Sequence, residues 1–468
     1  MWVYTSLSKW RLLASDKYAA ILVFVTAVML RMVPELAAYP YPMGYDVINY
    51  YIPVVAHFEQ HWPVAASQFP LYVIILHFVN LATGLSAHSV VIATAIIMFG
   101  VFGSSVFYIA RSLLKLGVGY SVFLAVFVII QVAVLRTAWD LHRDIFALAT
   151  MMLAFCLVSR KDIGWKELAA LLALSSLTVA ADRMIGALFC MSLAAYAIAA
   201  RRAVPPAVFS TGLFSALMIA SYAAAPGIEP NAAGASAAAS FDFYNPQNLL
   251  ILFAVINGLL AVLAAIGLMH MKNAALLLKI PLVISLAGSF SWLAFPDTAL
   301  FVADRWIIIA GIFLAIFAGY GIIHLIRNLK VKPAVAGFVL AAFAAVGLAY
   351  AVMPHDSPFV LYAAARASIE KFGPVTMQFN ALDIEDNDEI LSTIAQINED
   401  TEPDAVIVGE KHWRGFMEMY LKGQRTYRFS NDPQVLAEAL DNKGEHAYLL
   451  KFNPNSPDLF VIEDVYRR

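Results

Sequence analysis

Charge is scarce in this sequence of 468 residues. Only 14% of the residues are charged and 61% are hydrophobic, whereas a soluble domain has about 25% charged residues. The core of a soluble protein cannot bury that much apolar surface, so the composition and the mean hydropathy of +0.73 predict an integral membrane protein. The formal net charge of −2 provides no basic field that would attract nucleic acid.

Cysteine is rare as well, and nucleotide-binding glycine motifs are missing. Cys156 and Cys190 both lie inside apolar runs, which argues against a disulfide framework and gives thiol catalysis no support. Without a P-loop, the sequence shows no sign of transport driven by ATP. His57 and His61 are four residues apart and share a helix face that could bind a metal, but the segment does not follow the His-Glu-x-x-His order and offers no obvious third ligand. We therefore expect no cofactor, and a divalent metal is not indicated.

Long apolar runs are what the sequence does contain. A membrane-spanning helix needs about 20 mostly apolar residues. About eleven candidates occur, near residues 18–33, 88–110, 118–135, 145–159, 166–181, 184–200, 204–225, 247–270, 280–296, 306–325 and 334–353. Residues 69–85 are also apolar, but they are short and interrupted by proline and glycine, which favours an interfacial or re-entrant helix.

Basic and acidic residues alternate between the connections that join these runs. If the N-terminus is cytoplasmic, every expected inner connection carries at least two Lys or Arg, as the positive-inside rule requires. The outer connections then hold the acids Glu35, Asp46, Asp140, Asp144, Asp182, Glu229, Asp242, Asp297 and Asp304. We therefore predict a transmembrane domain over residues 1–353 and an extracytoplasmic domain over residues 354–468. The expected location is the plasma membrane of a prokaryote.

The pattern of the chain changes after residue 353. Short strands are predicted at residues 375–380, 404–409, 426–430, 446–452 and 459–466, with helices at 386–399, 413–421 and 433–442. Strands that alternate with helices are typical of a small, mostly parallel sheet. The predicted fold class is thus a polytopic α-helical membrane protein with a small C-terminal soluble α/β domain.

One candidate functional residue follows the first span. Asp46 comes after a turn at Gly44 and next to Tyr45. A carboxylate close to the membrane surface suits a general base that acts on a hydroxyl group. An aromatic belt with a helix-capping aspartate explains the same residues, and this alternative stays open.

Arginine and aspartate are neighbours in three further outer connections. The connection between the third and fourth spans holds Arg136, Trp139, Asp140, His142, Arg143 and Asp144, and two later ones hold Asp182 with Arg183, and Asp304 with Arg305 and Trp306. Arginine suits phosphate because its fork of donors binds two oxygens at once. Interfacial ion pairs, a local surface pair of Asp182 with Arg183 and a snorkelling Arg305 are the alternative interpretations.

This arrangement resembles the GT-C superfamily of integral membrane glycosyltransferases, which includes protein O-mannosyltransferases and lipid A aminoarabinose transferases. The resemblance covers roughly residues 1–353. Its features are an acid soon after the first span, an interfacial Pro-x-Tyr helix, an acid that opens the fourth span and an Arg-aromatic pair that opens a late span. They are matched by Asp46, Pro70-Leu71-Tyr72, Asp144 and Arg305-Trp306. The first loop has one acid rather than a pair, and the Trp-Trp-Asp-Tyr-Gly motif of oligosaccharyltransferases is absent.

The resemblance implies transfer of a sugar from a polyprenyl-phosphate-linked donor to a lipid, glycan or protein hydroxyl. It makes Asp46 and Asp144 the catalytic candidates, with Asp46 as general base, and it implies no metal. The implied substrate-binding residues are Tyr45, Arg136, His142, Arg143, Asp182, Arg183, Asp304 and Arg305. A lipid or solute transporter and a non-enzymatic membrane scaffold remain the alternatives, although charges gathered at one membrane face favour a surface reaction over transport.

Overall fold

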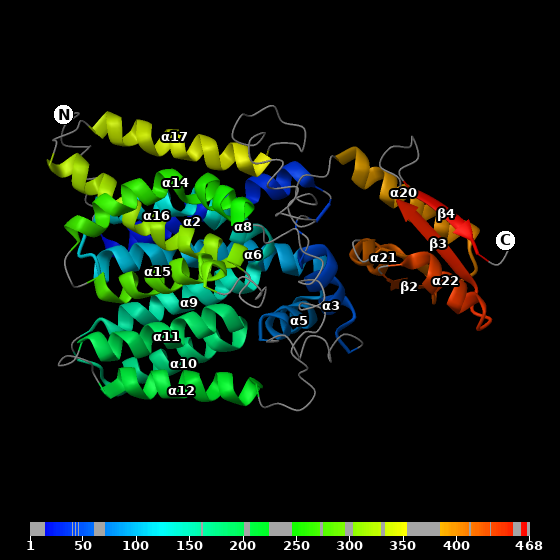
Figure 1. Cartoon of the computed structure of the whole chain (residues 1–468), viewed down its shortest axis with the longest axis horizontal. Coiled ribbons are helices and arrows are strands. Elements are labelled where there is room, and N and C mark those ends of the chain that lie inside the picture. The colour runs from blue at the N-terminus through cyan, green and yellow to red at the C-terminus, as the bar shows by residue number, and fades with distance from the viewer. Residues whose placement is uncertain are drawn as a thin grey trace.

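The computed structural model describes residues 15–39, 41–42, 44, 46–59, 71–160, 162–200, 206–223, 246–271, 275–294, 303–328, 333–352, 384–410, 413–430, 432–452 and 460–465. They form a large helical bundle and a smaller C-terminal domain with a four-stranded sheet (Figure 1). The predicted strand at residues 375–380 lies outside the described residues.

The bundle consists of helices that lie side by side (Figure 1). Their bounds are α2 Asp16–Ala38, α6 Ala87–Ser112, α7 Val118–Ile129, α8 Val132–Asp140, α9 His142–Val158, α10 Trp165–Ala181, α11 Arg183–Ala200, α12 Pro206–Ala223, α14 Pro246–His270, α15 Leu276–Ser289, α16 Ala303–Asn328 and α17 Pro333–Val352. Each apolar run that the sequence predicts as a span overlaps a helix, and the run 118–135 overlaps the pair α7 and α8.

Several of these helices can cross a membrane. Within the described residues, α2, α6, α11, α14 and α16 are long and apolar enough, and α7 with α8 adds a sixth if the two are counted as one broken span. Helices α5 and α15, and the stretches Pro206–Ser221 of α12 and Gly337–Gly347 of α17, are apolar but shorter. The protein is therefore a helical membrane protein with several spans, whereas the count of about eleven stays a prediction.

The third predicted span differs from the expectation of one continuous helix. Helices α7 and α8 are bent by 63° relative to each other. Gln131 between them is extended, and its side-chain amide donates to the carbonyl oxygen of Phe127 at 2.6 Å. A continued helix would use that carbonyl for the backbone N–H of Gln131, so the glutamine side chain replaces the helical bond at the break.

The connection between the third and fourth predicted spans is also not a turn. Helix α8 continues to Asp140, so Arg136 and Trp139 are helical, and only Leu141 separates α8 from α9. The backbone of Leu141 leaves the helical region with φ −95° and ψ 57°. The charged residues of this connection are consequently held on two helices.

The C-terminal domain contains α20 Ile384–Asp400, β1 Val406–Gly409, α21 Arg414–Tyr420, β2 Thr426–Phe429, α22 Pro433–Asp441, β3 Ala447–Phe452 and β4 Phe460–Asp464. The strand order is β2-β1-β3-β4, with β1 parallel to β2 and β3 and with β4 antiparallel to β3. All residues of the central strand β1 are buried. The small, mostly parallel α/β sheet predicted from the sequence is confirmed.

Short helices of the α2–α6 connection lie between the bundle and the C-terminal domain (Figure 1). The π-helix η1 spans Val47–Tyr51, α3 spans Ile52–Ala56, and α5 spans Leu71–Thr83. With 13 residues, α5 is too short to cross a bilayer. Helix α21 contacts both η1 and α3, so the C-terminal domain packs on this connection.

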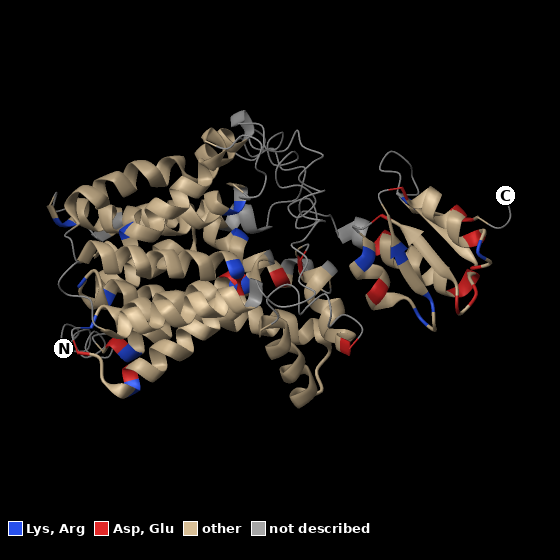
Figure 2. Cartoon of the chain, turned by 60° about the horizontal axis from the view of Figure 1, so that its bottom comes forward, with Lys and Arg blue, Asp and Glu red and all other residues tan. Residues whose placement is uncertain are grey.

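Charged residues gather at the two ends of the bundle, and its middle is almost free of them (Figure 2). At one end Arg111 pairs with Asp16 at 2.9 Å, and the guanidinium of Arg327 lies over the ring of Tyr120. Arg305 lies at the other end of the helix that carries Arg327. The candidate site is built at this second end.

Candidate functional site

The ends of α9, α10 and α16 bring together ionisable residues that are far apart in the sequence. Asp144 lies in the first turn of α9, Asp182 follows α10, and Arg305 lies in the first turn of α16. The two aspartates are almost fully buried. Asp144 interacts electrostatically with Asp182, Arg305 and Arg143. These four residues, together with Asp46, are named the carboxylate–arginine cluster.

Asp182 also caps the next helix. Its Oδ1 accepts the backbone N–H groups of Met184 and Ile185, at 2.8 and 2.9 Å, where α11 begins. Unpaired N–H groups and the helix dipole favour a carboxylate at a helix N-terminus, so the cap holds Asp182 in place where α10 ends and α11 begins.

Arg143 links the buried pair to Asp46. Its guanidinium carbon lies 5.5 Å from the ring centroid of Tyr50, and it interacts electrostatically with Tyr51, Asp182 and Asp46. Asp46 is half-buried and directly precedes η1. The sharp turn expected before it is present at Gly44, whose φ of 96° favours glycine. Asp46 therefore belongs to the same electrostatic neighbourhood as Asp144.

Aromatic side chains cover one side of the cluster. The ring of Tyr51 is stacked on His142 with 5.2 Å between centroids, and its edge-to-face contact with Tyr72 measures 5.5 Å. Burial raises the pKa of the Tyr50 and Tyr51 hydroxyls, so both stay neutral at physiological pH. Neither hydroxyl has a hydrogen-bond partner among the described residues. Both can thus donate to a polar group that enters the cluster.

Arg31 is a residue of this region that the sequence analysis missed. It is fully buried in α2, where its Nη2 pairs with Glu35 at 2.6 Å and its Nε donates to the Ala138 carbonyl oxygen of α8 at 3.1 Å. It also interacts electrostatically with Tyr72 and His142. The spacing of Arg31 and Glu35, which places them on one helix face, is the signal that could have identified the pair.

The other predicted site residues are distributed differently. His142 is buried, and its Nε2 lies 3.0 Å from the carbonyl oxygen of Trp139. Arg136 is buried in α8. Arg183 is exposed whereas Asp182 is buried and caps α11, so the interpretation of these two as a local surface pair is wrong. Asp182 is buried because it caps α11, whereas the side chain of Arg183 is exposed to the surroundings of the bundle.

Some predicted features fall outside the described residues or gain no support. Tyr45 and the side chain of Asp304 are not described. In the part of the chain that the structure describes, no group of three or more His, Cys, Asp or Glu is arranged to hold a metal ion. His57 is exposed after α3, and His61 lies outside the described residues.

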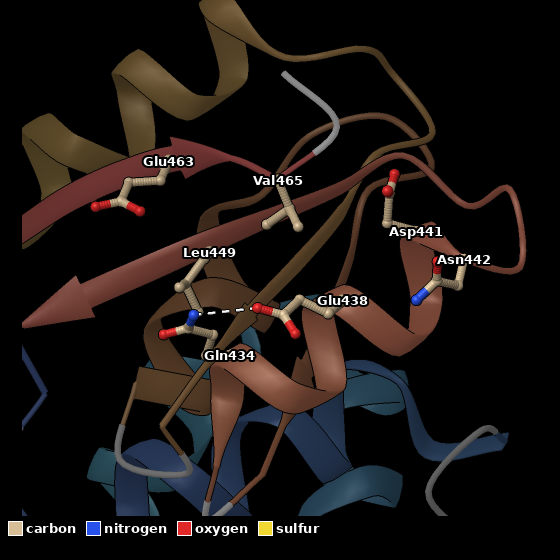
Figure 3. Close-up of a pocket in the computed structure, with 7 residues that line it drawn as sticks. All are labelled: Gln434, Glu438, Asp441, Asn442, Leu449, Glu463 and Val465. Atoms are coloured by element: carbon tan, nitrogen blue, oxygen red, sulfur yellow. Dashed lines mark hydrogen bonds between the residues drawn. The ribbon is translucent and has the colours of Figure 1, made fainter. Parts of the chain in front are cut away.

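A cavity of about 260 Å³ lies in the C-terminal domain beside α22, β3 and β4 (Figure 3). It is lined by Gln434, Glu438, Asp441, Asn442, Leu449, Glu463 and Val465. Two of its acids are engaged within the protein, because Glu438 accepts a hydrogen bond from Gln434 at 3.1 Å and Glu463 pairs with Lys451 at 2.8 Å. No residue of the predicted site lines it.

The cluster combines groups with complementary chemistry at one end of the bundle. Arg143 and Arg305 provide two positive charges suited to an oxyanion, and Asp46 provides a half-buried proton acceptor. Comparisons with known proteins give no independent identification, because the chain matches no protein-family model and no curated protein. The resemblance to GT-C glycosyltransferases therefore stays a prediction that rests on these residues.

Proposed function

We propose that this protein is a membrane glycosyltransferase that moves a sugar from a polyprenyl-phosphate-linked donor to an acceptor hydroxyl at the outer membrane face. The observation that supports this most strongly is that three carboxyl groups meet two arginines at one end of the bundle. Asp46 and Asp182 interact with Arg143, and Asp144 interacts with both Arg143 and Arg305. Charges near hydrocarbon are costly and usually have a function. A scaffold does not require such a cluster.

Asp46 is the general base in this proposal. Asp144 and Asp182 are almost fully buried and engage each other, so half-buried Asp46 is the carboxylate that an acceptor hydroxyl can approach. Asp46 takes the hydroxyl proton while the oxygen attacks the anomeric carbon. The bond between that carbon and the phosphate oxygen breaks, and the lipid phosphate leaves with the electron pair.

Arg305 and Arg143 stabilise the leaving phosphate. The phosphodiester of the donor carries one negative charge before the reaction, and the leaving phosphate monoester gains a second. Asp46 loses its negative charge at the same time, when it accepts the hydroxyl proton, so the two arginines face the growing charge of the phosphate. Asp144 acts in this scheme by holding the two arginines rather than by touching the substrate.

The finer topology belongs to the same proposal. About eleven spans, with a cytoplasmic N-terminus and an extracytoplasmic C-terminal domain, place the cluster at the outer face. Arg111 and Arg327 then lie at the inner end, as the positive-inside rule expects.

Cysteine labelling tests this topology. Lys166 is exposed in the first turn of α10, and Lys443 is exposed in the C-terminal domain. In a protein that lacks Cys156 and Cys190, an impermeant maleimide added to intact cells should label Lys443→Cys and spare Lys166→Cys. Permeabilised cells, in which both positions should react, provide the control. Labelling of Lys166→Cys alone in intact cells would reverse the orientation.

A transfer assay tests the activity. The purified protein in nanodiscs is given a panel of polyprenyl-phosphate sugars together with a membrane extract as the source of acceptors. The expected result is release of free polyprenyl phosphate and appearance of the sugar on an acceptor. Passage of an intact lipid across the bilayer without cleavage would identify a transporter. If folded protein neither transfers sugar nor moves lipid, the scaffold interpretation would be favoured.

A further inference from the structure

The C-terminal domain rests on the segment that carries Asp46. Ile48, two residues after Asp46, is buried in the same apolar cluster as Trp413, Phe416 and Met417 of the C-terminal domain. A residue of the α2–α6 connection therefore completes the hydrophobic core of a domain that lies far along the chain.

Gly415 makes this close packing possible. A Cβ atom at Gly415 would overlap the carbonyl group of Ile48. Backbone cannot move aside as the end of a flexible side chain can, so any larger residue would push α21 away from η1. The first turn of α21 thus lies directly on the backbone that leads to Asp46.

A second anchor lies on the other side of Asp46. Tyr41 is buried and donates a hydrogen bond to Asp388 in α20. This bond to a carboxylate raises the pKa of Tyr41 from 10.0 to about 12, so the hydroxyl keeps its proton at physiological pH. Tyr41 and Ile48 flank Asp46 in the sequence, and both are held by the C-terminal domain.

We infer that the docked C-terminal domain positions Asp46, with Gly415 as the positioning residue. This inference rests on the proposed function, since it assigns the placement of the base to a domain outside the bundle. Asp46 follows a turn at Gly44 and directly precedes η1, so the position of its carboxylate depends on the position of η1. If η1 shifts when α21 is displaced, the carboxylate moves relative to Arg143 and Arg305, which stay on the bundle.

The first experiment measures sugar transfer by full-length Gly415→Ala. A displacement of about 1 Å can lower a rate roughly 10²-fold, so kcat is expected to fall by that order. The KM for the donor should stay unchanged because the arginines are not moved. Gly337→Ala is the matched control, since Gly337 is a helical glycine of α17 with open space around it. A wild-type kcat in Gly415→Ala would overturn the inference.

A double-mutant cycle separates positioning from a general loss of structure. In an Asp46→Asn background, Gly415→Ala should cause no further loss, because no base remains to be misplaced. A second loss of the same size in that background would show that Gly415 acts on the fold as a whole, and the inference would be wrong.

Hydrogen exchange gives a readout that does not depend on activity. Amides of η1 and α3 should lose protection in Gly415→Ala and, through loss of the second anchor, in Tyr41→Phe, whereas Gly337→Ala should match the wild type. Unchanged protection in Gly415→Ala would overturn the inference even if sugar transfer is observed. Loss of protection in a protein that transfers no sugar would instead support the docking while the proposed function fails.

Discussion

Asp144 and Asp182 are two buried carboxyl groups that interact electrostatically, although one residue opens α9 and the other follows α10. The same two helices are joined further along by a hydrogen bond between the hydroxyls of Thr150 and Thr178 at 2.9 Å. Asp182 is also fixed by the first turn of α11. The pair is therefore a rigid support for Arg143 and Arg305, which suits the positioning role proposed for it.

The cap that Asp182 provides predicts unequal effects of two substitutions at this position. An asparagine oxygen can still accept the N–H groups of Met184 and Ile185, so Asp182→Asn should keep most of the stability. Asp182→Ala removes the acceptor, and loss of a helix N-cap costs about 1 kcal/mol. Thermal unfolding in detergent measures both. Asp182→Ala with wild-type stability would contradict the role of the cap.

The buried pair of Arg31 and Glu35 should be sensitive to loss of one partner. Arg31→Met leaves Glu35 buried without its counter-charge, which costs about 3–5 kcal/mol, and Arg31→Met with Glu35→Leu should recover most of the stability. Arg111→Met is the control, because the Arg111–Asp16 pair is partly exposed and its loss should cost less than about 1 kcal/mol. Equal effects of Arg31→Met and Arg111→Met on thermal unfolding would contradict the importance of burial.

The sequence predicted the helical runs and the small sheet well, because hydrophobic length and alternation are local properties. The break between α7 and α8 was not predicted, since the apolar pattern continues through it and Gln131 is the only polar signal. Arg31 was overlooked for a related reason, because it lies inside the apolar segment of α2 and only its spacing to Glu35 indicates a pair.

The candidate site could be predicted only as separate pieces. Asp46, Asp144 and Arg305 were recognised individually from their positions at helix ends. Their convergence depends on how α9, α10 and α16 pack, which no local pattern encodes. The contact of Gly415 with Ile48 likewise joins two distant segments, so nothing near either residue in the sequence points to the other.

Arg305 is expected to contribute to donor binding through the geometry of its guanidinium. A lysine keeps the charge but lacks the fork that binds two phosphate oxygens. Arg305→Lys should therefore raise the KM for the polyprenyl-phosphate donor, and Arg305→Ala should raise it further. Arg327→Lys and Arg327→Ala are matched controls at the opposite end of α16 and should not change it. An unchanged KM in both Arg305 variants would leave only the snorkelling interpretation.

Asp46 carries the chemical step of the proposed reaction. Asp46→Asn keeps the size of the side chain but removes the base, and general-base catalysis contributes about 10²–10⁴-fold. Transfer should fall by that order while donor binding persists, since Arg143 and Arg305 remain. Asp46→Glu should recover little because the added methylene misplaces the oxygen.

The matched control for Asp46 is Asp16→Asn. Asp16 begins α2 at the opposite end of the bundle, where it pairs with Arg111. The Asp16→Asn variant should transfer sugar at the wild-type rate. The measurement is sugar transfer from a purified donor in nanodiscs, with donor binding followed in parallel. If Asp46→Asn also transfers sugar at the wild-type rate, Asp46 has only a structural role at the start of η1. The base would then have to be Asp144.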